Sequence, residues 1–212
     1  YYNYKKGFTP DFKGLNDFTG KIIHPQHWPD KLDYKNKKVV VIGSGATAVT
    51  IIPKMAEHTA EITMLQRSPT YVGAFPNNDK TARFLKKYLP KNLAHNFIRF
   101  KNIFVQILFF QACKIWPKKM KKWLVNGAQK QLGDFSAKPH FEPNYNPWDQ
   151  RFCVAPDGDL FKCIRNGKAN VITNEIECFT EGGIRLKNNS ELRADIIITA
   201  TGLELLAFGG AN

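Results

Sequence analysis

The sequence predicts an α/β fold built around a parallel β-sheet. A run of β-branched residues at 39–42 ends in a glycine-rich turn, and apolar residues at helical spacing follow it from 49 to 55. A second apolar run at 62–65 comes after that helix, and a third follows Asp195, at 196–199, and ends in small residues at 200–202. Buried strands that alternate with helices are typical of sheets whose strands run parallel. We therefore expect one sheet-based domain.

The turn after the first strand matches a nucleotide-binding pattern. Its residues fit G-x-G-x-x-A: Gly43, Ser44, Gly45, Ala46, Thr47 and Ala48. Between a strand and a helix this pattern is the dinucleotide fingerprint. Gly43 permits the tight turn, Gly45 lets the backbone approach a pyrophosphate, and Ala48 lets the helix pack on the strand. The helix N-terminus attracts the pyrophosphate through its free N–H groups. We expect a Rossmann-like domain here; the alternative is an ordinary strand–helix turn without a ligand.

The end of the second strand indicates which dinucleotide binds. An acidic residue that hydrogen-bonds the ribose is expected about 20 residues after the glycines, but this position reads Gln66-Arg67-Ser68. A carboxylate there would repel a 2′-phosphate, whereas a guanidinium binds phosphate through charge-assisted hydrogen bonds. These residues therefore predict NADPH rather than NADH, unless Arg67 is only a solvated surface residue.

Shorter elements follow in the second half of the chain. Asp157-Gly158-Asp159 begins a short helix that ends near Gly167. Three strands separated by turns, at 170–173, 176–180 and 184–187, then predict an antiparallel β-meander. We expect an inter-domain linker at 1–37 and a Rossmann-like domain in two parts, 38–79 and 133–202. A basic helical insertion at 80–132 lies between these two parts, and residues 203–212 begin the return to a second domain.

The insertion carries the whole excess of positive charge. The net charge is +13 at pH 7, and residues 80–132 contain thirteen Lys or Arg and no Asp or Glu. Several apolar residues share one helical face, namely Phe97, Phe100, Phe104, Ile107 and Leu108. The longest nearly apolar run, 103–113, is too short to cross a bilayer, which takes about 20 residues.

Three interpretations of the insertion stay open. It is a helical lid packed on a partner domain, a basic amphipathic surface on anionic membrane, or a nucleic-acid-binding surface. Lys118, Lys119, Lys121 and Lys122 would contact phosphates. No recognisable nucleic-acid module surrounds these lysines, so we expect no nucleic-acid partner.

Length and composition are those of a globular protein. The chain has 212 residues, of which 43% are hydrophobic, enough for one good core. No N-terminal signal sequence is visible. The four cysteines form no C-x-x-C pair, which predicts buried free thiols in a reducing compartment and no metal site. We expect a cytoplasmic protein, with peripheral contact to the inner membrane face through residues 80–132 as an open alternative.

The segment before the fingerprint carries a longer motif, F-x-G-x-x-x-H-x-x-x-W-P. Its fixed positions are Phe18, Gly20, His24, Trp28 and Pro29. This motif resembles the signature of Baeyer–Villiger monooxygenases, flavoproteins that use FAD, NADPH and dioxygen, and is closest to their ethionamide-activating branch. Related flavin-containing monooxygenases usually have Phe or Tyr in place of Trp-Pro. The fingerprint, Arg67 and the turn at Thr201 follow in the family's order, so the resemblance covers almost the whole chain.

The resemblance implies an enzyme that inserts one oxygen atom from O2 into a ketone, or oxidises a sulfur or thiocarbonyl substrate. The family places an arginine after a Y-x-P-x-x-x segment, where it stabilises negative charge. Here the segment runs from Tyr145 to Arg151, so Arg151 is the expected catalytic residue; the alternative is that it pairs with Asp149 or another local acid. Thr201 is expected at the cofactor site, and His24 is expected to be a linker residue that couples domain movement to turnover.

Two parts of the family's pattern are missing from this sequence. Members carry an N-terminal G-x-G-x-x-G that binds FAD and a C-terminal segment that completes the FAD domain. We therefore expect this chain to be the NADPH domain of a longer protein, with most of the FAD site in the missing segments and no activity alone. The alternatives are a flavin-containing monooxygenase acting on nitrogen or sulfur, and a non-catalytic basic membrane-binding module.

Overall fold

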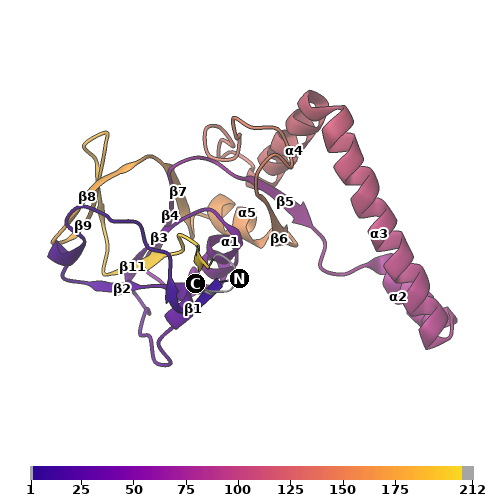
Figure 1. Cartoon of the computed structure of the whole chain (residues 1–212), viewed down its shortest axis with the longest axis horizontal. Coiled ribbons are helices and arrows are strands. Elements are labelled where there is room, and N and C mark those ends of the chain that lie inside the picture. The colour runs from indigo at the N-terminus through magenta and orange to yellow at the C-terminus, as the bar shows by residue number, and fades with distance from the viewer. Residues whose placement is uncertain (1, 207–212) are drawn as a thin grey trace.

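A five-stranded parallel sheet forms the centre of the computed structural model, which describes residues 2–206 (Figure 1). The strands lie in the order β2–β11–β3–β4–β7. Their bounds are Lys21–Ile23, Ile196–Thr199, Lys38–Ile42, Glu61–Gln66 and Asn170–Thr173, in that order. Each neighbouring pair is parallel, which confirms the expected α/β class.

The sheet is buried on both faces. Successive residues of a strand point to opposite faces, and in β3 Val39 and Val41 enter one core while Val40 and Ile42 enter another. The first core also contains residues of three helices: α1 (Ala46–Met55), α4 (Pro117–Leu132) and α5 (Asp159–Arg165). A strand buried on both faces reads as a continuous apolar run, which explains why β3 and β11 could be recognised in the sequence.

An antiparallel meander covers the second face. Its strands are β8 (Ile176–Thr180), β9 (Gly183–Leu186) and β10 (Glu191–Arg193). Phe179 and Ile184 of the meander are buried in the same core as Ile197 of the sheet. The strands expected at 176–180 and 184–187 are therefore confirmed as parts of a meander, but the strand expected at 170–173 is β7, which pairs in parallel with β4 in the central sheet. Strand β10 was missed because two of its three residues are charged, which leaves no apolar signal.

Four further strands of the described residues lie outside the central sheet and were not predicted. β5 (Tyr71–Phe75) and β6 (Phe152–Pro156) pair in parallel with each other. β1 (Tyr2–Gly7) and β12 (Leu203–Leu205) form an antiparallel pair that brings the two ends of the described chain together. The expected return toward a second domain lies, from residue 207 onward, outside the described residues.

Residues 80–132 lie between β5 and β6 in the chain and form three helices, α2 (Lys80–Tyr88), α3 (Lys91–Ile115) and α4. α4 packs on β5 and α5. Figure 1 shows α3 extending away from the sheet, with α2 at its far end. All side chains at 102–108 of α3 are exposed. Among the described helices, none combines the length and apolar character needed to cross a membrane.

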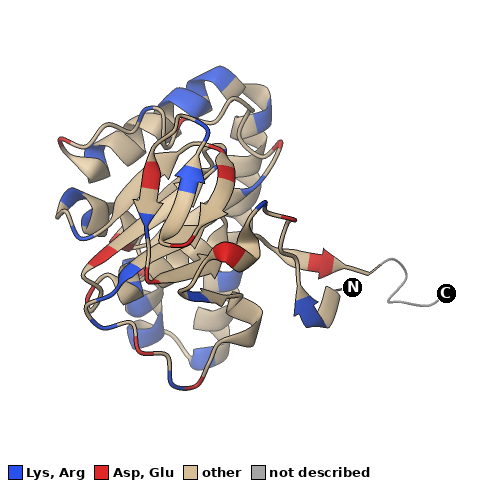
Figure 2. Cartoon of the chain, turned by 90° about the vertical axis from the view of Figure 1, so that its left-hand side faces the viewer, with Lys and Arg blue, Asp and Glu red and all other residues tan. Residues whose placement is uncertain are grey.

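Charge is distributed differently in the two parts of the molecule. Seen from the side of the meander, basic and acidic positions are interspersed over the sheet (Figure 2). Outside residues 80–132 the chain carries eighteen residues of each sign. The basic character of the protein therefore comes from α2, α3 and α4.

The four cysteines are free. Cys113 and Cys153 are buried as expected, but Cys163 and Cys178 are only partly buried, so the expectation of burial is wrong for these two. Cys178 is adjacent to the buried Phe179 in β8, and neighbouring residues of a strand face opposite sides. Its side chain therefore points away from the core.

Candidate functional site

A pocket of about 320 Å³ lies at the carboxyl ends of the parallel strands. In open α/β sheets this edge is where ligands bind. Predicted site residues from β4, from the turns after β3 and β11, and from the loop before β6 line it together: Gly43, Ser44, Gln66, Arg67, Ser68, Arg151 and Thr201. The pocket thus brings the fingerprint turn, the expected phosphate-binding arginine and the expected catalytic arginine to one place.

The helix that begins at this pocket is open to an anion. α1 has Gly45 as its N-cap, and no side chain within residues 2–206 caps its free N–H groups. A Cβ on Gly45 would meet only Arg151 Nη1, at 3.8 Å. Ala46 and Thr47 in the first turn are exposed, whereas Ala48 is fully buried in the core. The uncapped N–H groups and the free approach fit the pyrophosphate of a dinucleotide.

The backbone conformation at position 43 requires a glycine. Its φ is 129°, a conformation that side-chain-bearing residues rarely adopt. A Cβ there would lie 2.4 Å from the carbonyl oxygen of Ala200, directly after β11. The tight turn expected at Gly43 is therefore also a point where two neighbouring strands end close together.

Two of the lining residues use their side chains within the fold. Ser44 Oγ lies 2.9 Å from Thr70 Oγ1, and both residues are buried. Gln66 is 2% exposed, and its Nε2 donates to the carbonyl oxygen of His140 at 2.7 Å and to Thr173 Oγ1 at 2.9 Å. These side chains therefore bind to residues behind the pocket, because none of their partners is among the residues that line it.

Arg67 and Ser68 are exposed where β4 ends. None of the ion pairs formed by the described residues involves Arg67. Glu175, which also lines the pocket, pairs with Lys187. The hydrogen bond from Lys187 is the main reason that the pKa of Glu175 is lowered, and Arg67 contributes less. The Arg67 guanidinium therefore remains available to an anion.

Arg151 reaches toward the fingerprint turn, as its Nη1 close to Gly45 shows. Asp149 is not its ion-pair partner, because Asp149 Oδ1 accepts a hydrogen bond from Lys114 Nζ at 2.8 Å. That hydrogen bond is also the main cause that lowers the pKa of Asp149. Across residues 2–206, Arg151 takes part in no ion pair. An uncompensated guanidinium next to the positive end of a helix attracts negative charge.

His24 of the signature motif lies between Gly7 at the end of β1 and Gly202 in the turn after β11. Its Nε2 is 3.0 Å from the carbonyl oxygen of Gly202, and its Nδ1 accepts from the backbone N–H of Gln26 at 3.2 Å. The ring also packs so closely on Gly7 that a Cβ there would lie 2.0 Å from His24 Cε1. This position suits a linker residue. Thr201 Oγ1 likewise joins the two ends, donating to the carbonyl oxygen of Phe8 at 2.6 Å.

The other signature residues lie outside the pocket. Phe18 is buried in the second core, and its ring covers Gly20. Trp28 and Pro29 are exposed, and Trp28 lines a separate cavity of about 630 Å³ beside α1 and α5. Phe18 therefore contributes to the packing around the sheet, and none of these signature residues lines the candidate pocket.

Sequence reasoning missed two groups of residues that complete the pocket. Asn174, Glu175 and Ile176 follow β7, while Phe8, Pro10 and Phe12 come from the N-terminal segment. The first group could have been found, because β7 is parallel to β4 and ends at the same edge. The second group gives no such signal, since its place depends on how the N-terminal segment crosses the sheet.

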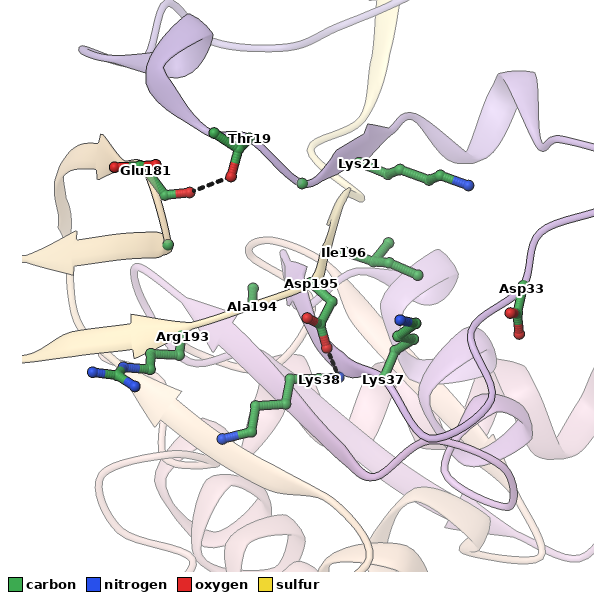
Figure 3. A pocket seen from close by; sticks show the side chains of 12 residues that line it. Thr19, Lys21, Asp33, Lys37, Lys38, Glu181, Arg193, Ala194, Asp195 and Ile196 are labelled. Atoms are coloured by element: carbon green, nitrogen blue, oxygen red, sulfur yellow. Dashed lines mark hydrogen bonds between the residues drawn. The ribbon is translucent and has the colours of Figure 1, made fainter.

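A larger cavity, of about 760 Å³, lies near the amino ends of β2, β3 and β11. Its basic residues are Lys21, Lys37, Lys38 and Arg193, and its acidic residues are Asp33, Glu181 and Asp195. The basic side chains point in different directions rather than toward one point (Figure 3). This mixed, divergent lining does not form an anion site, and the candidate site is the smaller pocket.

Comparison with known sequences identifies close relatives. The flavin-binding monooxygenase-like family matches residues 4–208. The FAD-containing monooxygenase EthA is 56% identical in Mycolicibacterium smegmatis and 53% identical in Mycobacterium tuberculosis, over all of this chain. The probable FAD-binding monooxygenase AlmA of Acinetobacter baylyi is 51% identical over 99% of the chain. The chain spans only 42–44% of the length of these relatives.

Solved structures share the fold at low sequence identity. OTEMO in complex with FAD and NADP has a TM-score of 0.69 at 20% identity, covering 92% of this chain and 44% of that one. Steroid monooxygenase bound to NADP has a TM-score of 0.69 at 18% identity, covering 93% and 44%. Cyclohexanone monooxygenase from Rhodococcus sp. Phi1 bound to NADP+ has a TM-score of 0.67 at 16% identity, covering 92% and 44%.

Proposed function

Because this chain belongs to the flavin-binding monooxygenase-like family, we propose that it is the NADPH-binding part of an FAD-dependent monooxygenase. The full-length protein inserts one oxygen atom from O2 into a ketone, or oxidises a sulfur or thiocarbonyl substrate. One observation carries this proposal: Gly43 and Ser44 of the dinucleotide fingerprint line a single pocket together with Arg67 and Arg151. The relatives named as FAD-containing monooxygenases support it.

The start of α1 and the two arginines each have a role in this proposal. The uncapped N–H groups of α1 bind the pyrophosphate of NADPH, and Gly45 leaves room for its approach. Arg67 binds the 2′-phosphate. Arg151 holds negative charge that develops on oxygen during the reaction. FAD, bound mainly by segments outside this chain, supplies the activation of dioxygen when it is present.

The choice of cofactor tests the role of Arg67. Arg67→Ala should weaken NADPH binding by roughly 1–3 kcal/mol, the size of a charge-assisted hydrogen bond to phosphate. NADH binding should barely change, because NADH has no 2′-phosphate. Calorimetric titration of both cofactors into the full-length protein measures the two effects.

Arg185→Ala is the matched control, since Arg185 is exposed on β9 and does not line the pocket. This variant removes the same charge and should leave both affinities unchanged. Equal losses of NADPH and NADH affinity in Arg67→Ala would remove Arg67 from the 2′-phosphate site.

We also propose that α2, α3 and α4 contact an anionic membrane surface in the full-length protein. Large apolar side chains of residues 80–132 are at least 50% exposed: Phe84, Tyr88, Leu93, Phe97, Phe100, Phe104, Val105, Ile107, Leu108, Ile115, Trp116 and Trp123. The same segment holds thirteen basic and no acidic residues. Exposed aromatic and basic side chains together favour the interface of anionic lipids.

Vesicle binding tests this contact. Lys118, Lys119 and Lys122 are exposed, whereas Lys121 donates to the Pro143 carbonyl oxygen and is left unchanged. Replacing the three exposed lysines by alanine should weaken binding to anionic vesicles about 100-fold, at about 1 kcal/mol for each charge. Raising the salt concentration from 0.1 to 1 M should also release the protein, because the Debye length falls from about 10 to 3 Å.

Alanine at Lys31, Lys35 and Lys37 provides the control for the vesicle experiment. These lysines are also exposed, and their loss removes the same charge outside the insertion. Co-sedimentation of the control variant should match that of the unaltered protein. Absence of binding to anionic vesicles at 0.1 M salt would instead favour the lid interpretation, in which the apolar face packs on another domain.

A further inference from the structure

The loop that carries Arg151, residues 145–151, is held by helix α3. The indole of Trp148 makes edge contacts with the rings of Phe109 and Phe110, with centroids 6.2 and 5.9 Å apart. One residue later, Asp149 Oδ1 accepts a hydrogen bond from Lys114 Nζ at 2.8 Å. Two successive turns of α3 therefore bind two consecutive residues of the loop.

Trp148 itself has an unusual backbone conformation. Its φ is 70°, a left-handed value that is rare for a bulky residue. Such conformations persist only where the surroundings hold them, and they occur often at functional sites. Here the surroundings are the two α3 rings and Phe152, whose ring is stacked on the indole at 5.4 Å. The strained residue lies three positions before Arg151.

The start of the loop, at Tyr145, is anchored to β5. The hydroxyl of Tyr71 donates to the carbonyl oxygen of Tyr145 at 2.7 Å, and the Tyr145 hydroxyl donates to the carbonyl oxygen of Arg151 at 3.3 Å. Tyr71 is 1% exposed, and burial, with smaller contributions from nearby groups, raises its pKa to about 12, so it stays a donor at neutral pH. The loop is therefore fixed at its start, and its ends are joined.

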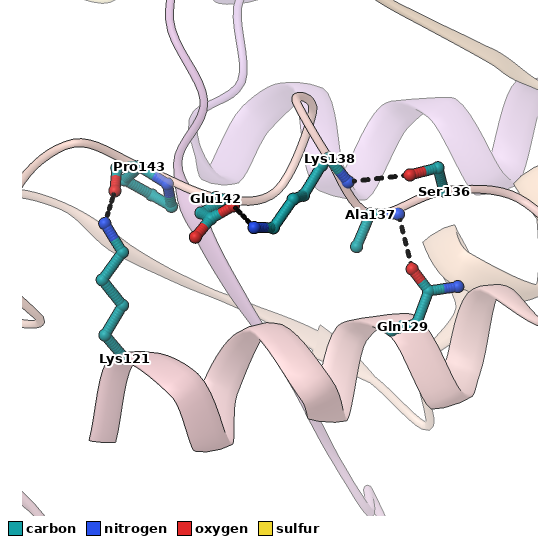
Figure 4. A network of polar contacts seen from close by, with 7 residues as sticks. All are labelled: Lys121, Gln129, Ser136, Ala137, Lys138, Glu142 and Pro143. Carbon is teal, nitrogen blue, oxygen red and sulfur yellow. Dashed lines mark hydrogen bonds and ion pairs between the residues drawn. The ribbon is translucent and has the colours of Figure 1, made fainter. Parts of the chain in front are cut away.

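The segment leading into the loop is fastened to α4. Gln129 of α4 accepts a hydrogen bond through its Oε1 from the backbone N–H of Ala137 at 2.8 Å (Figure 4). Within the segment itself, Lys138 pairs with Glu142 at 2.9 Å. Lys121 of the same helix donates to the Pro143 carbonyl oxygen. With its start held by β5 and α4, the middle of the loop depends on α3 for its position.

We propose that α3 sets the position of Arg151 at the cofactor pocket, and that Lys114, Trp148 and Asp149 are positioning residues for that arginine. This inference rests on the proposed function and on the place of Arg151 Nη1 beside Gly45 at the start of α1, where its charge also favours binding of the cofactor's pyrophosphate. It gives the insertion a role in the site itself: the outer part of α3 is exposed, and its inner part holds the arginine loop.

Two ion pairs of α3 provide a matched comparison. Lys114 pairs with Asp149 in the arginine loop, and Lys101 pairs with Asp79, which caps α2. The side chains of both pairs are about one-third to two-fifths exposed. Lys114→Met and Lys101→Met therefore remove the same charge from the same helix, but only Lys114→Met releases the loop.

Calorimetric titration of NADP+ into the oxidised, FAD-loaded full-length protein tests the inference without turnover. Lys114→Met should weaken NADP+ binding about 2- to 5-fold, as for a partly exposed ion pair, and Lys101→Met should leave it unchanged. Trp148→Gly should weaken it about 10-fold, within the range for residues in contact. Glycine adopts the φ of 70° freely, so this variant relieves the backbone while it releases the contact with α3.

The decisive comparison uses the Arg151→Ala background. If Lys114 acts through Arg151, then Lys114→Met should cause no further loss of NADP+ affinity once the arginine is absent. An equal effect of the two lysine variants, or a loss that persists in the Arg151→Ala background, would overturn the inference. Failure of the unaltered protein to bind NADP+ would overturn the proposed function instead, and the inference with it.

Discussion

Arg151→Ala in the full-length protein should accept electrons from NADPH and yet form almost no oxygenated product. The guanidinium lies next to Gly45 at the start of α1 and has no ion-pair partner among the described residues. A fixed cation of this kind stabilises negative charge that develops on oxygen, and losing one such group costs about 10²- to 10³-fold in rate. Product formation and hydrogen peroxide release, each measured per NADPH consumed, should separate: product falls and peroxide rises.

Arg165→Ala is the control for this experiment. Arg165 ends α5, is exposed, and donates to the carbonyl oxygen of Gln131 rather than lining the pocket. Its loss should leave the ratio of product to NADPH unchanged. Normal product formation by Arg151→Ala would exclude this arginine from the chemistry. The proposed role of Arg67 in NADPH binding would not be affected by that result.

The parts of the fold that could be predicted are those whose signal is local. Val39 to Ile42 form an apolar run, the glycines follow it directly, and the helix begins within the same ten residues. Strands β5 and β6 give no comparable signal. β5 contains Gly73 and ends at the exposed Phe75, and its partner lies about 80 residues away, beyond the insertion. Pairing over such a distance depends on the tertiary structure.

The same distinction applies to the site. Gly43 and Arg67 could be placed together because strands that run parallel end at one edge of a sheet, and Thr201 was expected there from the resemblance to the family. The direction of a side chain is a different matter. Gln66 sits at the predicted position, yet its amide nitrogen is bound to His140 and Thr173. The contact between Trp148 and α3 was also beyond sequence reasoning, because it joins a loop to a helix across the insertion.

Gly45→Ala should impair NADPH binding while leaving the fold intact. Gly45 has an extended backbone, with φ of −78°, that alanine adopts freely. The added Cβ would meet only Arg151 Nη1, at the ordinary contact distance of 3.8 Å. The methyl group would, however, stand where the pyrophosphate approaches the N–H groups of α1. Thermal unfolding should therefore be unchanged, while calorimetry should show NADPH binding weakened about 10-fold or more, equivalent to about 1.4 kcal/mol.

Gly43→Ala should mainly reduce folding stability, in contrast to Gly45→Ala, which should mainly reduce NADPH binding. At φ of 129° an alanine is strained, and its Cβ would lie 2.4 Å from the Ala200 carbonyl oxygen, a backbone atom that cannot rotate away. We expect this variant to lose roughly 1–3 kcal/mol of folding stability from backbone strain alone, and more from the clash. The two glycines thus separate folding from binding within one turn. If Gly45→Ala retained full NADPH affinity, the pyrophosphate would have to bind elsewhere than at the start of α1.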